Sequence, residues 1–371
     1  PSWPFKGGIA QYTTALYRQL ATRQKVLFIS FKRQYPGWLY PGESDKDPSD
    51  LQLKEPASQR LIDSLSPWTW FKTVRKLRDF QPDTVIYHWW VMYWAPQFIL
   101  MIHYQRLVLK DTRVVFICHN VVAHEPGRLS RFLTRQALRL GDGFLVHSEQ
   151  DRADLEAMLP GAAIATAEFP SYELDPGELV DRHQAREALR LQGDVLLFFG
   201  FVRPYKGLDV LLEAMALVLP VHPCTLLVAG EIWGDREAYS RQIERLGIAG
   251  QVRFSGNYIP RDQVANYFGA CDLVVLPYRS ATGSGVVKMA YSHHRPVLVT
   301  RVGSLPDTVI DGKTGKVVEP ENVEQLASAI TVFLQRGDRA KMEQEVAALD
   351  RQFSWQQVLA ALDSIADSPR A

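Results

Sequence analysis

Short apolar runs alternate with stretches of helical spacing along the whole chain. The runs that we expect to form buried strands cover residues 25–31, 84–88, 113–119 and 143–148 in the first half, and 195–200, 225–230, 252–255, 273–277 and 296–300 in the second. Helical spacing covers residues 9–22, 68–80, 129–140, 208–219, 238–246, 262–270, 286–293 and 323–335, and returns after Trp355. This alternation is typical of parallel α/β structure.

The chain has 371 residues, and single hydrophobic cores stop growing at roughly 250–300 residues, so we expect two domains. Residues 169–193 are rich in Pro, Gly and acidic residues, which indicates a linker and a leading helix. The sequence therefore predicts two doubly wound, Rossmann-like domains, 1–172 and 173–354, that face a central cleft. We expect the final helix, within residues 355–371, to pack back on the first domain. Because the chain opens on a turn-rich segment without an initiator Met, we also expect a strand upstream.

Composition narrows the class of protein only slightly. Apolar residues make up 46% of the chain, charged residues 22%, and the formal net charge is +1, which gives no global attraction to nucleic acid. Cys118, Cys224 and Cys271 lie far apart in apolar runs, as expected of core residues in a reducing compartment. No apolar run approaches the roughly 20 residues of a membrane span. We expect a cytoplasmic location.

The first candidate for chemistry is the segment FFGFVRPYKG at residues 198–207, between an expected strand and an expected helix. A strand, a glycine turn at Gly200 and a helix start together form an anion site. Arg203 and Lys206 add two cations to the same turn, and Gly207 permits a close approach of the backbone. The segment predicts a phosphate-binding loop.

The second candidate is the loop that contains TGSGV, residues 282–286, which also follows an expected strand and opens a helix. Gly283 and Gly285 flank Ser284, so that backbone N–H groups can converge on an oxyanion. Thr282 and Ser284 offer hydroxyl donors, and Val286 begins the helix. We expect this loop to bind the same phosphates.

The ordered set FFGFVRPYKGLDVLLEA, LLVAGE, VRFSGNYIP, CDLVVLPY and RPVLVTRVGSLPDTVIDGKTGKVVEP resembles family 4 of the retaining GT-B glycosyltransferases. KGGIAQYTTAL and VVFICHN extend the resemblance into the first half. It implies a nucleoside diphosphate sugar as co-substrate, with UDP or GDP as the expected nucleotide, no resident cofactor or metal, and retention at the anomeric carbon by front-side attack. Lys206 occupies the family's lysine position. The family's arginine position holds Phe201, and we interpret Arg203 as its substitute.

The chain departs from the family at the Glu-x7-Glu motif, whose two positions fall on Ala281 and Met289. In the family these carboxylates contact the transferred sugar and the ribose, and neither Ala nor Met can accept such hydrogen bonds. Glu231, after the run LLVAG, is a candidate replacement near the nucleotide and equally a solvated loop residue. Tyr258 and Ile259 occupy the family's base-binding position, against the alternative of a plain turn before Pro260.

In the first half, Gly7 and Gly8 precede a helix, so that its first N–H groups can close on a ligand. In the family this loop lies against the donor. His119 ends an expected strand at the place of a family histidine that contacts the donor sugar, which implies a role in positioning or charge stabilisation. His124 and Glu125 follow in a loop, where they either touch the acceptor, tune His119 or cap the next helix.

The acceptor is less defined by the sequence. Trp89 and Trp90 follow a strand, and both acceptor binding and simple packing remain open. Residues 66–80 combine aromatic side chains with Lys72, Arg75, Lys76 and Arg78, which fits contact with an anionic membrane or an ordinary solvated helix face. The resemblance implies a glycan or polyprenyl-diphosphate-linked acceptor. The membrane alternative for residues 66–80 corresponds to peripheral contact at the inner membrane face.

Two other functions fit parts of this pattern. A nucleotide-sugar epimerase shares the architecture, but it would need acid–base groups placed around the sugar ring. A non-catalytic sugar-nucleotide-binding scaffold would explain the loss of both motif carboxylates.

Overall fold

The computed structural model describes the chain except for residues 38–39, 41–43, 50–54, 123–126, 173–178 and 369–371. It divides into unit 1, which comprises Pro1–Phe169 and Ser354–Ala371, and unit 2, which comprises Pro170–Phe353. The sequence predicts this boundary between residues 172 and 173, within a few residues of the observed one after Phe169. In the described residues, no helix is long and apolar enough to cross a membrane.

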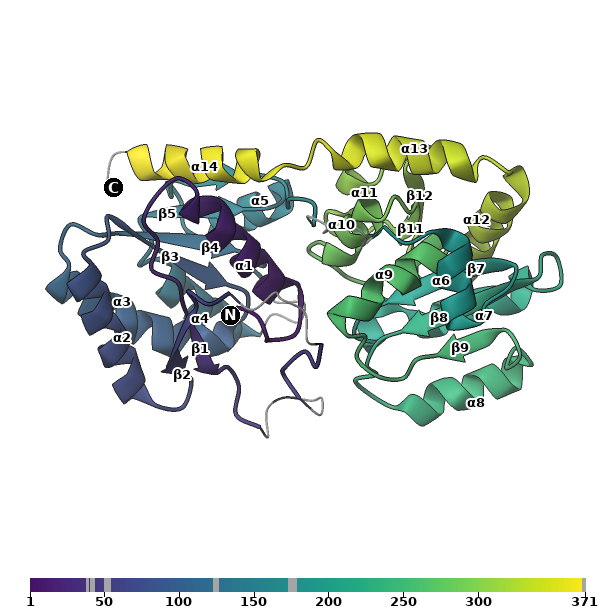
Figure 1. The fold of residues 1–371 in the computed structure, drawn as a ribbon, viewed down its shortest axis with the longest axis horizontal. Helices are drawn as coiled ribbons and strands as arrows, with labels where there is room; N and C mark the ends of the chain where they lie inside the picture. Colours follow the sequence, from purple (N-terminus) through teal and green to yellow (C-terminus); the bar gives the residue numbers. More distant parts are fainter. Residues whose placement is uncertain (38–39, 41–43, 50–54, 123–126, 173–178, 369–371) are drawn as a thin grey trace. The chain divides into compact units, whose positions relative to one another are not determined.

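Unit 1 contains a parallel sheet in the order β3-β4-β5-β6 and a separate parallel pair, β1-β2. Its strands are β1 (Ile29–Arg33), β2 (Gln59–Asp63), β3 (Thr84–Trp89), β4 (Arg113–Cys118), β5 (Gly143–Val146) and β6 (Ile164–Thr166). Its helices are α1 (Gly8–Ala21), α2 (Pro67–Phe80), the 3-10 turn η1 (Met92–Trp94), α3 (Ala95–Val108), α4 (Arg128–Leu138), α5 (Glu149–Met158) and α14 (Trp355–Asp367) (Figure 1).

Strand β4 shows how this sheet builds a core on each face. Its alternate residues Val114, Phe116 and Cys118 pack in one cluster, which α2, α3 and α4 complete. Val115 and Ile117 point the other way, into a cluster completed by α1 and α14. A strand covered on both faces reads as a continuous apolar run, which is why it could be recognised from the sequence.

The close approach of α14 to the sheet requires a glycine. A Cβ built on Gly143 of β5 would lie 2.2 Å from the Cγ2 atom of Ile365. The guanidinium of Arg113 in β4 donates to the carbonyl oxygen of Ile365 at 2.8 Å. These contacts fasten α14 to the sheet of unit 1.

Unit 2 contains one six-stranded parallel sheet in the order β12-β11-β10-β7-β8-β9. Its strands are β7 (Asp194–Phe199), β8 (Cys224–Ala229), β9 (Val252–Phe254), β10 (Leu273–Leu276), β11 (Val297–Thr300) and β12 (Gly315–Val318). Its helices are α6 (Arg182–Leu189), η2 (Pro204–Lys206), α7 (Leu208–Val218), α8 (Arg236–Leu246), α9 (Arg261–Ala270), α10 (Gly285–Ser292), α11 (Leu305–Thr308), α12 (Val323–Arg336) and α13 (Arg339–Asp350). Strands β7 to β9 follow one another in one direction across the sheet and strands β10 to β12 in the other, so the direction reverses between β7 and β10, as in a doubly wound nucleotide-binding sheet.

The strands differ from the sequence prediction mainly in unit 1. The predicted run 25–31 becomes β1 four residues later, and β1 ends at Arg33. It pairs in parallel with β2, whose polar sequence QRLID gave no strand signal. The short strands β6 and β12 and the helices α3, α5 and α13 were also not predicted.

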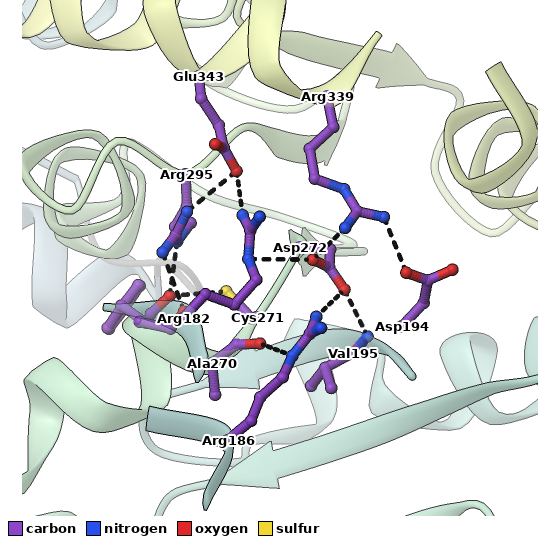
Figure 2. Close-up of polar contacts among 12 residues, drawn as sticks. Arg182, Arg186, Asp194, Val195, Ala270, Cys271, Asp272, Arg295, Arg339 and Glu343 are labelled. Carbon is purple, nitrogen blue, oxygen red and sulfur yellow. Dashed lines mark hydrogen bonds and ion pairs between the residues drawn. The ribbon is translucent and has the colours of Figure 1, made fainter. Parts of the chain in front are cut away.

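A buried carboxylate joins four elements of unit 2 at the amino ends of β7 and β10. The Asp272 side chain has no exposed surface, and its Oδ2 atom accepts from the Val195 amide at 2.7 Å. Figure 2 shows it between Arg182 and Arg186 of α6 and Arg339 of α13, with nitrogen–oxygen distances of 3.3, 2.5 and 2.6 Å. Burial raises the pKa of Asp272, against the lowering effect of the Val195 amide and the three guanidinium groups.

We expect Asp272→Asn to lower the free energy of unfolding of unit 2 by about 3 kcal/mol, because three guanidinium groups would lose their buried counter-ion. Urea-dependent hydrogen exchange of the β7 and β10 amides measures this loss locally. The matched control is Glu345→Gln on α13, an exposed acid whose change should cost less than about 0.5 kcal/mol. Equal exchange in the two variants would contradict the structural role of Asp272.

Candidate functional site

The two loops that the sequence predicts to bind phosphate follow neighbouring strands of unit 2. Strands β7 and β10 pair directly, with Leu196 opposite Leu273 and Leu197 opposite Val274. Their carboxyl ends therefore lie side by side at the point where the strand order reverses. Ligands of open α/β sheets bind at such a switch point.

Glycines let these loops meet backbone to backbone. Gly207, with φ of 70°, lies so close to the second loop that an added Cβ would be 2.0 Å from the Pro277 carbonyl oxygen. Likewise, a Cβ added to Gly230, whose φ is 151°, would lie 2.1 Å from the carbonyl oxygen of Gly200. Side chains are thus excluded from the points of contact, and the loops after β7, β8 and β10 form one surface.

Lys206 lies where these loops converge. Its side chain is buried, and its Nζ atom lies 5.5 Å from the centroid of the Tyr278 ring. A Cβ built on Gly200 would be 3.2 Å from this Nζ and 3.7 Å from Val286 of α10. Lys206 is thus adjacent both to the glycine turn and to the start of the second helix.

The electrostatics of Lys206 are those of an anion site. Burial, and secondarily the charge of Arg203, lower the pKa of Lys206 to about 7. In the part of the chain that the structure describes, no carboxylate forms an ion pair with this lysine. A buried cation without a counter-ion is costly, and an anionic ligand would relieve that cost.

Arg279 holds the Lys206 loop in place, a role that the sequence reasoning missed. Its guanidinium grips the Asp209 carboxylate with two hydrogen bonds, of 2.8 and 2.6 Å, and donates to the Pro204 carbonyl oxygen at 2.8 Å. Its own amide donates to the Tyr205 carbonyl oxygen at 2.7 Å. The loop after β10 therefore fixes the loop after β7.

Arg203 has a different environment, because its guanidinium lies over an aromatic ring. Its Cζ atom is 4.1 Å from the centroid of the Trp233 ring. The centroid of the Trp233 ring in turn lies 4.4 Å from that of the Phe201 ring. Tyr258 extends the row, 6.1 Å from Phe201. The row orients Arg203 by a cation–π contact, and Trp233 was not predicted as part of it.

Glu231 and Ile259 border this row in different ways. The Val202 amide donates to the Glu231 carbonyl oxygen at 2.9 Å, so the pairing of β7 with β8 continues into the loops and brings half-buried Glu231 to the site. Ile259 is only 6% exposed and packs in the core, so that only its backbone can contact a ligand.

The TGSG loop is ordered by its own hydrogen bonds. Ser284 caps α10, since its hydroxyl oxygen accepts from the Val286 amide at 3.2 Å. The carbonyl oxygen of Thr282 accepts from both the amide and the hydroxyl of Ser304, at 3.1 and 2.7 Å. Gly283 and Gly285 are exposed beside these contacts. The loop thus presents a preformed helix start.

The two positions of the missing motif carboxylates are apolar in the structure as well. Met289 is buried in the core, and Ala281 packs against the same cluster. Neither position offers a hydrogen-bond acceptor from its side chain, so a bound ribose would need other partners.

In unit 1, Gly7 precedes α1, and Gly8 is the first residue of that helix. Gly7 has φ of 98°, and an added Cβ would have no neighbour within 4 Å. Among the residues that the structure describes, no side chain caps the start of this helix. This geometry permits a ligand to approach the predicted loop.

His119 directly follows β4 and pairs with a second histidine that the sequence reasoning missed. Its amide donates to the Trp89 carbonyl oxygen at 2.8 Å, and its Nε2 atom lies 3.0 Å from Nδ1 of His88. The two rings stack with centroids 5.3 Å apart. Burial lowers the pKa of each histidine well below its ordinary value, which favours the neutral rings, and the contact between Nδ1 and Nε2 requires one of these two nitrogens to donate.

Two more side chains complete this histidine cluster. His147 follows β5, lies 5.7 Å from His119 between ring centroids, and places Nδ1 2.8 Å from the Ala167 carbonyl oxygen. Buried Tyr12 of α1 meets His119 edge-on at 4.9 Å. A signal for His88 and His147 existed, since three successive predicted strands each carry a histidine at the carboxyl end.

Other predicted residues lie outside the candidate site or outside the described residues. Trp89 is 1% exposed within the core, which favours packing over acceptor binding, while Trp90 donates to the Tyr35 hydroxyl at 3.1 Å. His124 and Glu125 are outside the described residues. Among the residues that are described, no three His, Cys, Asp or Glu side chains are arranged to hold a metal ion.

Two family models together match most of the chain. The model described as Glycosyltransferase Family 4 matches residues 6–165, and the model described as Glycosyl transferases group 1 matches residues 193–336. The chain is 27% identical over 226 residues to D-inositol 3-phosphate glycosyltransferase of Corynebacterium glutamicum, covering 59% of this chain and 53% of that protein. It is 34% identical over 205 residues to the enzyme of that name from Mycobacterium leprae strain Br4923, covering 52% and 46%. The chain thus spans about half the length of these relatives.

Solved structures show the same fold. Sucrose-phosphate synthase from Thermosynechococcus elongatus matches with a TM-score of 0.71 and 20% identity, over 96% of this chain and 92% of that one. Anabaena HepE in complex with UDP-glucose matches with a TM-score of 0.64 and 18% identity, over 84% and 85%. The predicted fold class, α/β of the GT-B type with two Rossmann-like domains, is confirmed. The chain belongs to family 4 of the glycosyltransferases, the glycosyl transferases group 1.

Proposed function

We propose that the chain transfers a sugar from a nucleoside diphosphate sugar to a glycan or lipid-linked acceptor, with retention at the anomeric carbon and without a metal. The observation that carries the proposal is buried Lys206, which lies without a carboxylate partner among the described residues, beside two helix starts. Family membership supports the reaction class, and the HepE structure contains UDP-glucose, so UDP-sugars are the first donors to test. GDP-sugars are the second.

In this proposal, the bond between the anomeric carbon and the diphosphate oxygen breaks while the acceptor hydroxyl oxygen bonds to the same face of that carbon. The acceptor proton passes to the departing phosphate oxygen. Lys206, Arg203 and the first amides of α10 stabilise the negative charge that develops on the diphosphate. His119 positions the transferred sugar, and Gly7 and Gly8 close on the donor.

We predict that UDP or a UDP-sugar raises the free energy of unfolding by about 4 kcal/mol when its concentration is about a thousand times its dissociation constant. Thermal unfolding would detect this as a shift to a higher Tm. Lys206→Met should abolish this shift, because it removes the buried cation. The matched control is Lys313→Met, which removes an exposed lysine of unit 2 and should leave the shift intact. If no UDP-, GDP-, ADP- or dTDP-sugar shifts the wild type, the donor site is wrong.

We also predict that Lys206→Met stabilises the ligand-free protein, in a pH-dependent way. Since the pKa is about 7 instead of 10.5, the unfolded chain binds more protons here than the folded one between these pH values. The cost of the buried charge is therefore full below pH 7 and disappears as the pH approaches 10.5. The gain in unfolding free energy, at most about 5 kcal/mol, should shrink over that range in urea titrations. A gain independent of pH would contradict the charge argument.

The histidine pair gives a further prediction. His119→Ala should slow the release of UDP from its sugar donor by about 100-fold without changing the affinity for UDP. His88→Ala should have a smaller effect, because it leaves the ring of His119 in place but removes the partner that fixes its tautomer. Nitrogen-15 NMR of the free protein would then show mixed His119 tautomers in His88→Ala.

The control for this series is His103→Ala, which removes an exposed histidine whose hydrogen bond, in the described part of the chain, is to Ile99 of its own helix. It should leave both the rate and the His119 tautomer unchanged. Product analysis separates the rival functions: an epimerised donor without any acceptor would indicate an epimerase. Donor binding without transfer or hydrolysis, with no effect of His119→Ala, would indicate a scaffold.

A further inference from the structure

The exposed large hydrophobic side chains of unit 1 are confined to one group of helices. Among the described residues of this unit, all six lie on α2, α3 and α4 or just before α2: Leu65, Trp68, Leu100, Leu107, Leu129 and Phe132. Leu107 is 74% exposed, Leu129 65% and Trp68 60%. Helix α3 packs against both α2 and α4, so the three helices form a continuous layer, and Figure 1 shows α2 beside α3.

The same layer is strongly basic. Helices α2, α3 and α4 carry eight Lys or Arg residues and one acidic residue, Asp79, although the whole chain has 42 basic and 41 acidic residues. Asp79 is already paired with Arg78 at 2.9 Å. Lys72 and Arg75 both lie 5.9 Å from the ring centroid of Trp68, so that charge and apolar surface are adjacent.

Helix α4 shows the combination most clearly. Thr134, Ala137 and Leu138 face the core, and the opposite face carries Arg128, Arg131, Phe132 and Arg135, all exposed. Phe132 lies four residues after Arg128 and three before Arg135, which makes them neighbours on the helix surface. Exposed Arg139 follows at the helix end. None of these four arginines forms an ion pair among the described residues.

Like charges three and four residues apart weaken a helix unless a partner neutralises them. We propose that the layer of α2, α3 and α4 is a docking surface for an anionic lipid bilayer. Arginine and lysine side chains would meet the lipid head groups, while Phe132, Leu129 and Trp68 enter the boundary of the acyl region. This surface is independent of the donor loops in unit 2.

The charge pattern argues against two other occupants. A second copy of the chain in a twofold contact would bring the same arginines opposite one another, which is repulsive. A small phosphorylated ligand would pair with the arginines but would leave the exposed leucines and aromatic rings uncovered. A lipid bilayer with anionic head groups and an apolar acyl region complements both the basic and the apolar side chains of the layer.

Co-sedimentation of the full chain with vesicles tests the proposal. We expect binding to phosphatidylcholine vesicles that contain phosphatidylglycerol, weak binding to phosphatidylcholine alone, and a loss of binding in high salt. Each arginine near the surface raises the partition coefficient onto anionic vesicles about fivefold, so the double variant Arg131→Gln with Arg135→Gln should lower this coefficient by about 25-fold. Phe132→Ser should weaken it as well, and the salt dependence should persist.

The matched control is Lys313→Gln with Arg336→Gln, which removes two exposed charges from unit 2 and should leave binding unchanged. Thermal unfolding checks that every variant is folded. No binding of the wild type, equal binding to both vesicle types, or equal losses in the α4 and control variants would overturn the proposal. A dimer that Phe132→Ser dissociates, without any vesicle binding, would overturn it in favour of a second copy. Donor binding by UDP is measured separately, so failure here is distinct from failure of the donor site.

Discussion

The buried Asp272 carboxylate is the interaction on which the organisation of unit 2 depends. One negative charge, without contact with water, is shared by an amide of β7 and by guanidinium groups of α6 and α13. Such a group is stable only while all its partners are present, because each loss leaves an uncompensated buried charge. It therefore holds the amino ends of β7 and β10 in fixed register, and the loops at the opposite ends of these strands inherit that register.

At the carboxyl ends of the same strands, the electrostatic situation is the opposite of that at Asp272. Lys206 is as buried as a core residue, yet its ammonium group faces an aromatic ring and glycine backbone instead of a carboxylate. Arg279, two residues beyond Pro277, uses the available acids, Asp209 and Glu321, to fix the loop. The protein thus neutralises the Asp272 charge, which stabilises the fold, with guanidinium groups. Among the described residues it leaves the Lys206 charge, which we assign to ligand binding, without a carboxylate partner. Buried charges of this kind are typical of sites with perturbed pKa values.

The sequence predicted what depends on local pattern and missed what depends on pairing between distant segments. Strands such as β4 and β7, covered on both faces, are continuous apolar runs and were found. Strand β2, with the sequence QRLID, takes its structure from its pairing with β1 and left no such signal. Likewise Lys206 follows from a strand–glycine–helix pattern, whereas the bond between His88 and His119 requires knowing that β3 and β4 are adjacent. The assignment of each residue to catalysis or donor binding stays a prediction.

The departures from the family pattern become coherent when the residues are considered together. Phe201 stands where the family has arginine, and a lone substitution there would remove a phosphate ligand. In this chain the Phe201 ring packs at a tilt against the Trp233 ring, and the guanidinium of Arg203 lies over Trp233. The cation is displaced by two residues and held by aromatic contact, which costs little conformational entropy because both rings are rigid. Met289 and Ala281 replace hydrogen-bonding carboxylates with core packing. If the chain binds the proposed donor, recognition should therefore rest on charge and backbone more than on side-chain acceptors.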